Sequence, residues 1–393
     1  MYSVVASAIN HPDSIRPYQG LFNHRIIRSL NEAGTAIEAV SPRPFAPPVG
    51  PYSAYSSLPR TECWGGYTVH HPRFWYLLPK RLFYGVSGKS YARRIPEYVD
   101  RNFDPPDVVQ ACHIYPDGYG MVPYVRDHDL PLFVVSHGTL LNTLDSQPFG
   151  VRAMIEETLD EATGVLCVSD RLAEKARRLT APEKVTTVPI GADPDNFPVD
   201  QRQQIRRELD VDAETTVVLF VGRYTEAKGV SEIIEALPRL DPSDTVFVFV
   251  GTGGGLRDEL KRALAASPFP ERYVYSGLSP LALRRWFAIA DLLLLPSRSE
   301  GRPTVIYEAM ASRTAVLATD TDGIPEQVVD GETGVLIPPA DADALVAALS
   351  STVTDRDRLR RMGQAGHDRL LEQRWTWADH AERVQTLHRA AIR

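Results

Sequence analysis

Two carboxylates, Glu300 and Glu308, lie in a segment that joins a predicted strand to a predicted helix. The apolar run at 291–297 before them is typical of a buried parallel strand. Gly301 permits a tight turn, and Pro303 suits the first turn of a helix that continues through Glu308. The unpaired backbone amides at the start of such a helix attract phosphate. The segment therefore predicts a diphosphate-binding site, flanked by carboxylates that would hold hydroxyl groups.

Two cations form a second candidate site, in the segment 221–229. It follows another apolar strand pattern, and glycines before Arg223 and after Lys228 would let the backbone approach a ligand closely. An arginine binds phosphate through two parallel hydrogen bonds, and a lysine acts as a point charge. The two segments together indicate a ligand with a diphosphate in the middle and hydroxyl groups at its ends, such as a nucleotide sugar.

Each feature taken alone also has an ordinary structural interpretation. Glu300 could cap a helix, Glu308 could be a solvated helix residue, and the two cations could belong to a solvated loop. His137, at the end of a predicted strand, could be a structural hydrogen-bonding residue. Only the combination of the two segments favours a binding site.

Composition narrows the class of protein. The chain has 393 residues, 43% of them hydrophobic and 24% charged, which is enough for two globular domains. Its net charge of −7 argues against a general nucleic-acid binder. Cys63, Cys112 and Cys167 show no CxxC spacing, so we expect neither a disulfide framework nor a zinc site. We expect no signal peptide and no membrane-spanning helix, and therefore a cytoplasmic protein.

Apolar stretches of strand length alternate with helical patterns in both halves of the chain. The predicted strands are 4–8, 36–40, 107–111, 132–136, 164–168, 217–221, 246–250, 292–295 and 315–318. Such alternation predicts parallel sheets with helices on both faces. We expect an α/β protein with two doubly wound Rossmann-like domains facing across a cleft. The expected parts are 1–195, 196–374, and a C-terminal helix at 375–393 that packs back on the first domain.

The order of these motifs resembles glycosyltransferase family 4, a large retaining family with the GT-B fold. The matching residues in the second half are Gly222-Arg223, Lys228-Gly229, Pro296-Ser297, Glu300-Gly301-x-Pro303, Glu308 to Ala311 and Asp322 to Glu326. The first half matches more loosely, at Gln19 to Phe22, His113 to Gly118 and Ser136 to Gly138. The family usually has two glycines before its Pro-Glu pair, where this chain has Asp322-Gly323. This departure leaves the donor sugar open.

The resemblance implies a role for each motif in binding a nucleotide-sugar donor. Arg223 and Lys228 would neutralise the diphosphate of the leaving group without a metal ion or other cofactor. Glu308 would accept hydrogen bonds from the ribose hydroxyls. Glu300 would hold hydroxyls of the donor sugar. The remaining donor-binding residues implied by the resemblance are Gly20, Val274, Gly301, Pro303 and Thr304.

The resemblance also implies a reaction. His137 would face the donor sugar near the acceptor, and the acceptor hydroxyl would attack from the side of the leaving group, which retains the anomeric configuration. His113 is predicted to be a structural or surface residue. The acceptor could be a glycan, a lipid-linked saccharide or a small molecule, and the oligomeric state stays open. A nucleotide-sugar 2-epimerase and an inactive binding subunit of the same fold are the alternatives.

Three short motifs are interpreted as chance matches to other binding sites. The run Gly85 to Ser90 resembles the end of a phosphate-binding loop but lacks its first glycine and its strand. The glycines at 251–255 fail the dinucleotide fingerprint, although they could line the nucleotide site. Asp320-Thr321-Asp322 has the form of a metal-binding motif, but it lies inside a segment that the family resemblance already explains.

The segment 73–84 mixes aromatic residues with cations. We interpret it as a packed crossover or a substrate wall. Peripheral contact with the inner face of a membrane is the alternative.

Overall fold

The computed structural model describes residues 2–45, 53–75, 80–241, 244–267, 269 and 274–392. The chain divides into two compact units, one made of Met1–Ile190 with Trp377–Arg393 and the other of Gly191–Thr376. The sequence placed these divisions a few residues away, at 195/196 and 374/375. The backbone N–H of Ala192 donates to the carbonyl of Trp375 at 3.1 Å, which ties both ends of the second unit together.

The first unit is built on an eight-stranded sheet with the order β10-β9-β8-β7-β1-β2-β5-β4. Its strands are β1 (Ser3–Ser7), β2 (Ala36–Val40), β4 (Thr61–Trp64), β5 (Tyr67–His70), β7 (Val108–Ala111), β8 (Leu132–Ser136), β9 (Gly164–Cys167) and β10 (Val185–Thr187). All neighbouring strands pair in parallel except β4 and β5. A separate pair is formed by β3 (Arg43–Pro44) and β6 (Arg73–Phe74).

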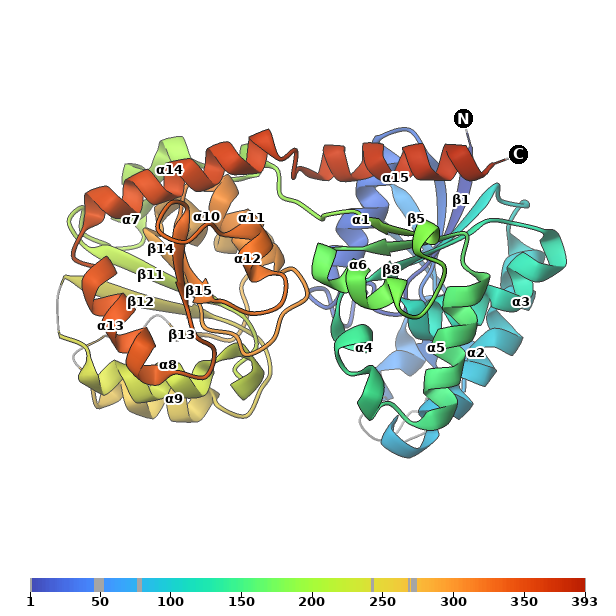
Figure 1. Ribbon diagram of the computed structural model, residues 1–393, viewed down its shortest axis with the longest axis horizontal. Coiled ribbons are helices and arrows are strands. Elements are labelled where there is room, and N and C mark those ends of the chain that lie inside the picture. Colours follow the sequence, from blue (N-terminus) through green and yellow to red (C-terminus); the bar gives the residue numbers. More distant parts are fainter. Residues whose placement is uncertain are drawn as a thin grey trace. The chain divides into compact units, whose positions relative to one another are not determined.

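Helices cover both faces of this sheet (Figure 1). They are α1 (Leu21–Glu32), α2 (Lys80–Asn102), α3 (Tyr119–His128), α4 (Thr139–Asn142), α5 (Phe149–Glu161), α6 (Asp170–Arg177) and α15 (Trp377–Ala391). The C-terminal helix α15 lies against α1, where Gln385 Nε2 donates to the carbonyl of Ala33 at 3.0 Å and to Thr35 Oγ1 at 2.8 Å. The end of the chain is therefore part of the first unit.

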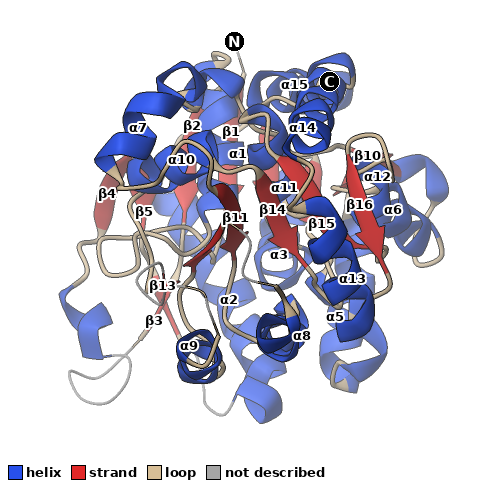
Figure 2. Ribbon diagram, turned by 90° about the vertical axis from the view of Figure 1, so that its left-hand side faces the viewer, coloured by secondary structure: helices blue, strands red, loops and turns tan. Residues whose placement is uncertain are grey.

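The second unit contains a six-stranded parallel sheet with the order β13-β12-β11-β14-β15-β16. Its strands are β11 (Thr216–Val221), β12 (Thr245–Val250), β13 (Val274–Tyr275), β14 (Leu292–Leu295), β15 (Ala315–Thr319) and β16 (Gly334–Ile337). Its helices are α7 (Arg202–Glu208), α8 (Val230–Ala236), α9 (Arg257–Ala265), α10 (Pro280–Ile289), α11 (Thr304–Ala311), α12 (Ile324–Gln327), α13 (Ala342–Thr352) and α14 (Arg356–Glu372). Figure 2 shows β11, β14 and β15 side by side between helices.

The predicted α/β class with parallel, doubly wound sheets is confirmed. Every strand predicted from the sequence is present, with ends displaced by one residue at most. These strands read as unbroken apolar runs because helices bury both faces, and all four leucines of β14 are fully buried. The strands β3, β4, β5, β6, β10, β13 and β16 were not predicted, and most of them are short or carry polar residues. The run Gly85 to Ser90 lies inside α2, which confirms that it is no phosphate-binding loop.

The first unit holds every histidine of the chain except His367. Burial lowers the pKa of His11 and of His388 to about 3, and the pKa of His24 and of His380 to about 4. These side chains are therefore neutral in the folded protein at neutral pH. In the unfolded chain the same groups bind protons below about pH 6.5.

Acidification is expected to destabilise the first unit more than the second. The stability that each neutral histidine contributes is fully present above its unfolded pKa and is lost as the pH falls toward the folded value, by roughly 1.4 kcal/mol per pH unit. Hydrogen exchange, corrected for intrinsic rates and compared between pH 7 and pH 5, should show lost protection in Met1–Ile190 and α15. Equal losses in both units would contradict this expectation. Replacing His388 with glutamine should reduce the pH dependence.

Candidate active site

Three loops of the second unit follow neighbouring strands of its sheet. The loop 222–229 follows β11, the loop 296–303 follows β14, and the loop 320–323 follows β15. Because β11, β14 and β15 are parallel neighbours, the loops leave the same edge of the sheet. The carboxyl ends of the strands are where ligands bind in such sheets. The two predicted segments are thus brought together.

Lys228 and Glu300 form an ion pair between the first two loops, from Lys228 Nζ to Glu300 Oε1. The hydroxyl of Ser297 donates to the same carboxylate oxygen at 2.8 Å. The side chains of Lys228 and Glu300 are only 22% and 10% exposed. A partly buried pair of this kind holds both groups in defined positions and stays accessible to a ligand from one side.

Close backbone contact sets the position of Lys228. Gly229 has a φ of +70°, and a Cβ atom there would lie 1.9 Å from the carbonyl oxygen of Pro296. The backbone N–H of Arg298 donates to the carbonyl of Ala227 at 3.0 Å. Only a glycine fits at 229, since the neighbouring residue is so close and the conformation is left-handed.

Asp322 occupies one of the two positions where the family usually has glycine, and its contacts explain how an aspartate is accommodated there. It has a φ of +46°, a conformation that favours glycine. Its Oδ2 accepts hydrogen bonds from Ser299 Oγ at 2.7 Å and from the backbone N–H of Glu300 at 2.9 Å. The side chain thus compensates for the backbone strain by holding the loop that carries Glu300. Since the Glu300 amide is used in this way, only the later amides of the loop are candidates for binding phosphate.

Glu308 lies in α11, one turn after the helix begins, and is only 7% exposed. Arg302, just before this helix, is held by an ion pair with Glu326 at 2.8 Å, and its guanidinium lies 4.8 Å from the centre of the Trp375 ring. Sequence reasoning assigned no role to Arg302 or Trp375, because their contacts come from segments distant in the chain. They fix the backbone that leads to Pro303 and Thr304.

Arg223 and Val274 lie at the same carboxyl-terminal end of the sheet, but they do not contact the ion pair of Lys228 and Glu300. Arg223 is exposed, and among the described residues no hydrogen bond or ion pair joins its side chain to Lys228 or Glu300. Val274 lies in β13, beside β12. The hydroxyl of Tyr224 donates to the carbonyl of Tyr275 at 2.7 Å and so links the loop after β11 to β13.

In the first unit, Gly20 and His137 are connected through Phe22. Gly20 precedes α1 with a φ of +73°, and a Cβ atom there would lie 1.8 Å from the carbonyl oxygen of Asn10. The rings of Phe22 and His137 are 4.6 Å apart. Burial, and then the positive field of His113, hold the pKa of His137 well below its usual value. This neutral imidazole has a buried Nε2 with no hydrogen-bond partner among the described residues.

His113 has both a structural contact and a place beside a cavity. Its Nδ1 pairs with Oδ2 of the buried Asp117 at 2.8 Å, and its ring lies 5.3 Å from that of His137. The other oxygen of Asp117 accepts the backbone N–H of Ile9 at 2.7 Å and the hydroxyl of Tyr91 at 3.0 Å. The sequence predicted a structural or surface residue, and His113 also lines the cavity described next.

A cavity of about 910 Å³ lies entirely within the first unit. Polar and aromatic side chains from distant segments form its wall. These include Asn10, Arg16, Gln19, Arg43, Tyr55, Phe74, Tyr84, His113, Tyr115, Thr139, Ser146 and Gln147. The sequence drew attention to few of them, because the wall is assembled from loops after several strands. Its size and mixed lining suit a small polar ligand.

The segment 73–84 contributes to this wall through Phe74 and Tyr84. Arg73 and Phe74 form β6. Residues 76–79 lie outside the described part of the chain, so contact of this segment with a membrane stays a prediction. Within the described ranges, no helix is both long enough and apolar enough to span a bilayer. The same ranges contain no group of three or more His, Cys, Asp or Glu side chains arranged for a metal ion.

Two family models match the chain. "Glycosyltransferase Family 4" matches residues 20–196, and "Glycosyl transferases group 1" matches residues 201–369. The putative teichuronic acid biosynthesis glycosyltransferase TuaC of Bacillus subtilis is 28% identical over 86% of each chain. Alpha-maltose-1-phosphate synthase of Mycolicibacterium smegmatis is 32% identical over 61% of this chain and 67% of that protein. The HepE protein of Anabaena, solved with UDP-glucose, superposes with a TM-score of 0.72 at 16% identity, over 98% of this chain and 99% of that one.

The close approach at Gly229 can be tested against a matched glycine. Gly331 has a similar φ of +77°, but a Cβ atom added there would have no neighbouring atom within 4 Å. Gly331→Ala should cost about 1–2 kcal/mol of unfolding free energy, from the left-handed backbone alone. Gly229→Ala should cost more, because it must also displace the Pro296 carbonyl. Chemical denaturation measures both, and equal losses would show that the approach is not constrained.

Proposed function

The chain belongs to glycosyltransferase family 4, whose fold is GT-B, and we propose that it transfers a hexose-type sugar from a nucleotide-diphosphate sugar to an acceptor hydroxyl with retention of configuration. The observation that carries this proposal is the partly buried ion pair of Lys228 and Glu300 at the carboxyl ends of β11 and β14. In this proposal Lys228 neutralises the leaving diphosphate, and Glu300, directly beside it, accepts hydrogen bonds from sugar hydroxyls.

The leaving group determines what the cations must do. When the bond from the anomeric carbon to the diphosphate breaks, negative charge grows on the phosphate oxygens. Lys228 stabilises that charge at a fixed position, and Arg223 reaches it from the exposed side of the same loop. We propose that these side chains replace a metal ion, so transfer should persist in excess EDTA.

The carboxylates bind the two hydroxylated ends of the donor. Glu308 accepts hydrogen bonds from the ribose, and Glu300 from the donor sugar, while amides of Gly301 and Thr304 contribute to the phosphate site. Glu300 is held by Lys228 and Ser297 before the donor arrives, so little reorganisation is needed. The acceptor hydroxyl then passes its proton to the departing phosphate oxygen, and no protein nucleophile is required.

Side chains of the first unit supply the acceptor side in this proposal. Gly20 lets the backbone approach the diphosphate, and neutral His137 binds a hydroxyl near the reacting carbon. The cavity beside His113 takes the acceptor. The name of TuaC links that relative to teichuronic acid synthesis, and a glycan acceptor in this chain would be consistent with it. A nucleotide-sugar 2-epimerase would instead give product from the donor without an acceptor.

Replacing Lys228 with glutamine is expected to weaken binding of a nucleoside diphosphate by about tenfold or more, because a charge-assisted hydrogen bond is lost. Arg223→Gln should have a smaller effect of the same sign, since this side chain is exposed. Glu308→Gln should weaken binding of the nucleoside diphosphate and of the nucleoside alike. Titration calorimetry with UDP, GDP and ADP measures these affinities.

Arg360→Gln serves as the control, since Arg360 is an exposed residue of α14 paired with Asp357. Its affinities should match those of the unmodified chain. Unchanged affinity in Lys228→Gln, or no binding of any of the three nucleotides, would reject the donor site. Turnover of a nucleotide sugar to an epimer without any acceptor would favour the alternative enzyme.

A further inference from the structure

Three arginines surround one carboxylate at the wall of the cavity in the first unit. They are Arg16, Arg43 and Arg73, and the carboxylate is that of Asp13. Arg16 and Arg43 line the cavity itself. An excess of positive charge beside a cavity needs an explanation, because each unpaired charge costs free energy when it is partly buried.

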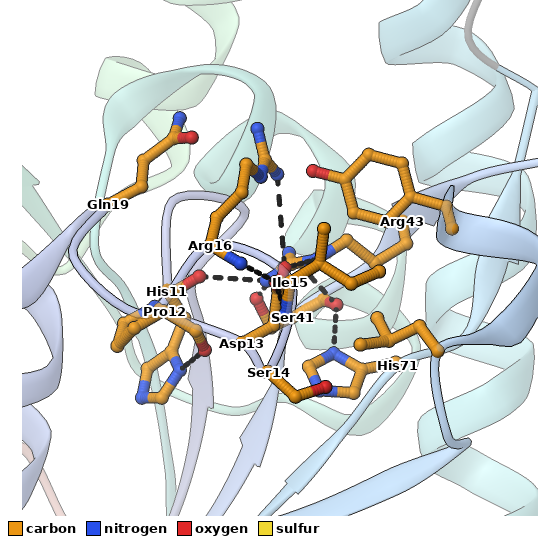
Figure 3. A network of polar contacts seen from close by, with 12 residues as sticks. His11, Pro12, Asp13, Ser14, Ile15, Arg16, Gln19, Ser41, Arg43 and His71 are labelled. Atoms are coloured by element: carbon orange, nitrogen blue, oxygen red, sulfur yellow. Dashed lines mark hydrogen bonds and ion pairs between the residues drawn. The ribbon is translucent and has the colours of Figure 1, made fainter. Parts of the chain in front are cut away.

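Arg43 is a structural residue. Its guanidinium is buried, with Nε 2.7 Å from Oδ2 of Asp13. Its other nitrogens donate to the carbonyls of Ile9 at 2.9 Å and His11 at 2.7 Å, and to Ser41 Oγ at 2.7 Å (Figure 3). These bonds tie the loop after β1 to the loop after β2.

Arg73 has a comparable structural task. It donates to the carbonyl of Tyr55 at 2.6 Å and to that of Leu58 at 3.1 Å. Both bonds hold the segment before β4. Arg43 thus neutralises Asp13, and Arg73 holds the neighbouring backbone, although its buried Nη1 has no hydrogen-bond partner among the described residues.

Arg16 differs from Arg43 in its contacts, and unlike Arg73 it lines the cavity. Its terminal nitrogen is 4.0 Å from Asp13 Oδ2, which already accepts the short bond from Arg43. The other oxygen of Asp13 accepts the backbone N–H groups of Ile15 at 3.0 Å and Arg16 at 2.7 Å. The Arg16 Nε is buried without a hydrogen-bond partner among the described residues. Its side chain is 37% exposed, so a ligand can reach it.

The described wall of the cavity supplies no negative charge of its own, although Asp117 lies behind it, paired with His113. The described lining of the cavity contains no Asp or Glu side chain. Glu62 accepts from the backbone N–H of Ser14 at 3.2 Å and pairs with His71 at 2.9 Å. Figure 3 shows Arg16 and Gln19 projecting to the same side, with the Arg16 guanidinium joined to Asp13 only by the long ion pair. The guanidinium of Arg16 lies over the Tyr55 ring at 4.8 Å, which orients it.

We propose that the cavity binds an anionic group of the acceptor, a carboxylate or a phosphate, through the guanidinium of Arg16. This inference rests on the proposed function and names the class of its acceptor: an acidic or phosphorylated saccharide. Arg16 binds the anion through parallel N–H donors, Gln19 adds an amide donor, and the aromatic wall at Tyr84 and Tyr115 faces the sugar ring.

The test uses the full chain with three probes: glucuronate, glucose 6-phosphate and methyl glucoside. Titration calorimetry in the presence of saturating UDP should show that at least one of the two anions binds about tenfold or more tightly than the neutral glucoside. The anion that binds more tightly shows whether the acceptor group is a carboxylate or a phosphate. Raising the salt concentration should weaken this binding.

Arg16→Gln should abolish the preference for the anion, and Arg16→Lys should retain part of it. Arg101→Gln, an exposed arginine at the end of α2 paired with Glu97, is the matched control and should retain the full preference. Thermal unfolding checks that each variant folds. If the neutral glucoside binds as well as both anions, if no probe binds, or if Arg16→Gln keeps the preference, the inference is overturned.

The two proposals fail separately. Loss of anion preference with normal nucleotide affinity would reject the role of Arg16 and leave the donor site intact. Anion binding that depends on Arg16, in a chain that binds no nucleotide, would reject the donor site alone.

Discussion

The ion pair between Lys228 and Glu300 depends on how closely two loops approach each other. Parallel pairing of β11 with β14 aligns the strand ends, but the pair forms only because Gly229 lets the backbone pass the carbonyl of Pro296. Asp322 from the next loop then fixes the amide of Glu300. The basic and acidic groups are therefore positioned by backbone geometry, which costs little reorganisation when a charged ligand binds.

Charge is distributed differently in the two units. In the second unit, the candidate cation Lys228 is held by an acid that also belongs to the site. In the first unit, Asp13 is already used by Arg43 and by backbone amides, so Arg16 keeps unused hydrogen-bonding capacity. Seven histidines of this unit have pKa values lowered chiefly by burial and add no charge at neutral pH. A donor diphosphate and an acidic acceptor would thus meet separate cations.

Local sequence patterns predicted the sheets but did not reveal the cavity. Strands such as β14 are recognised from local apolar runs, and Glu300 and Lys228 follow strands whose ends meet at one edge. The roles of Arg302, Trp375 and Arg16 depend on contacts between distant segments, which no local pattern encodes. His113 was predicted as structural because its position beside the cavity arises only from the folded loops. Asp322 stood out as a departure, but its compensating hydrogen bonds exist only once two loops meet in the fold.

Trp375 sits between two guanidinium groups, with Arg302 at 4.8 Å and Arg369 at 5.2 Å from its ring. Arg302 directly precedes Pro303, so the indole touches the base of the loop that leads into α11. The emission of a tryptophan depends on charges close to its ring. Trp375 is one of five tryptophans, so in a variant that keeps this indole alone the fluorescence would follow rearrangements of that loop without any attached dye.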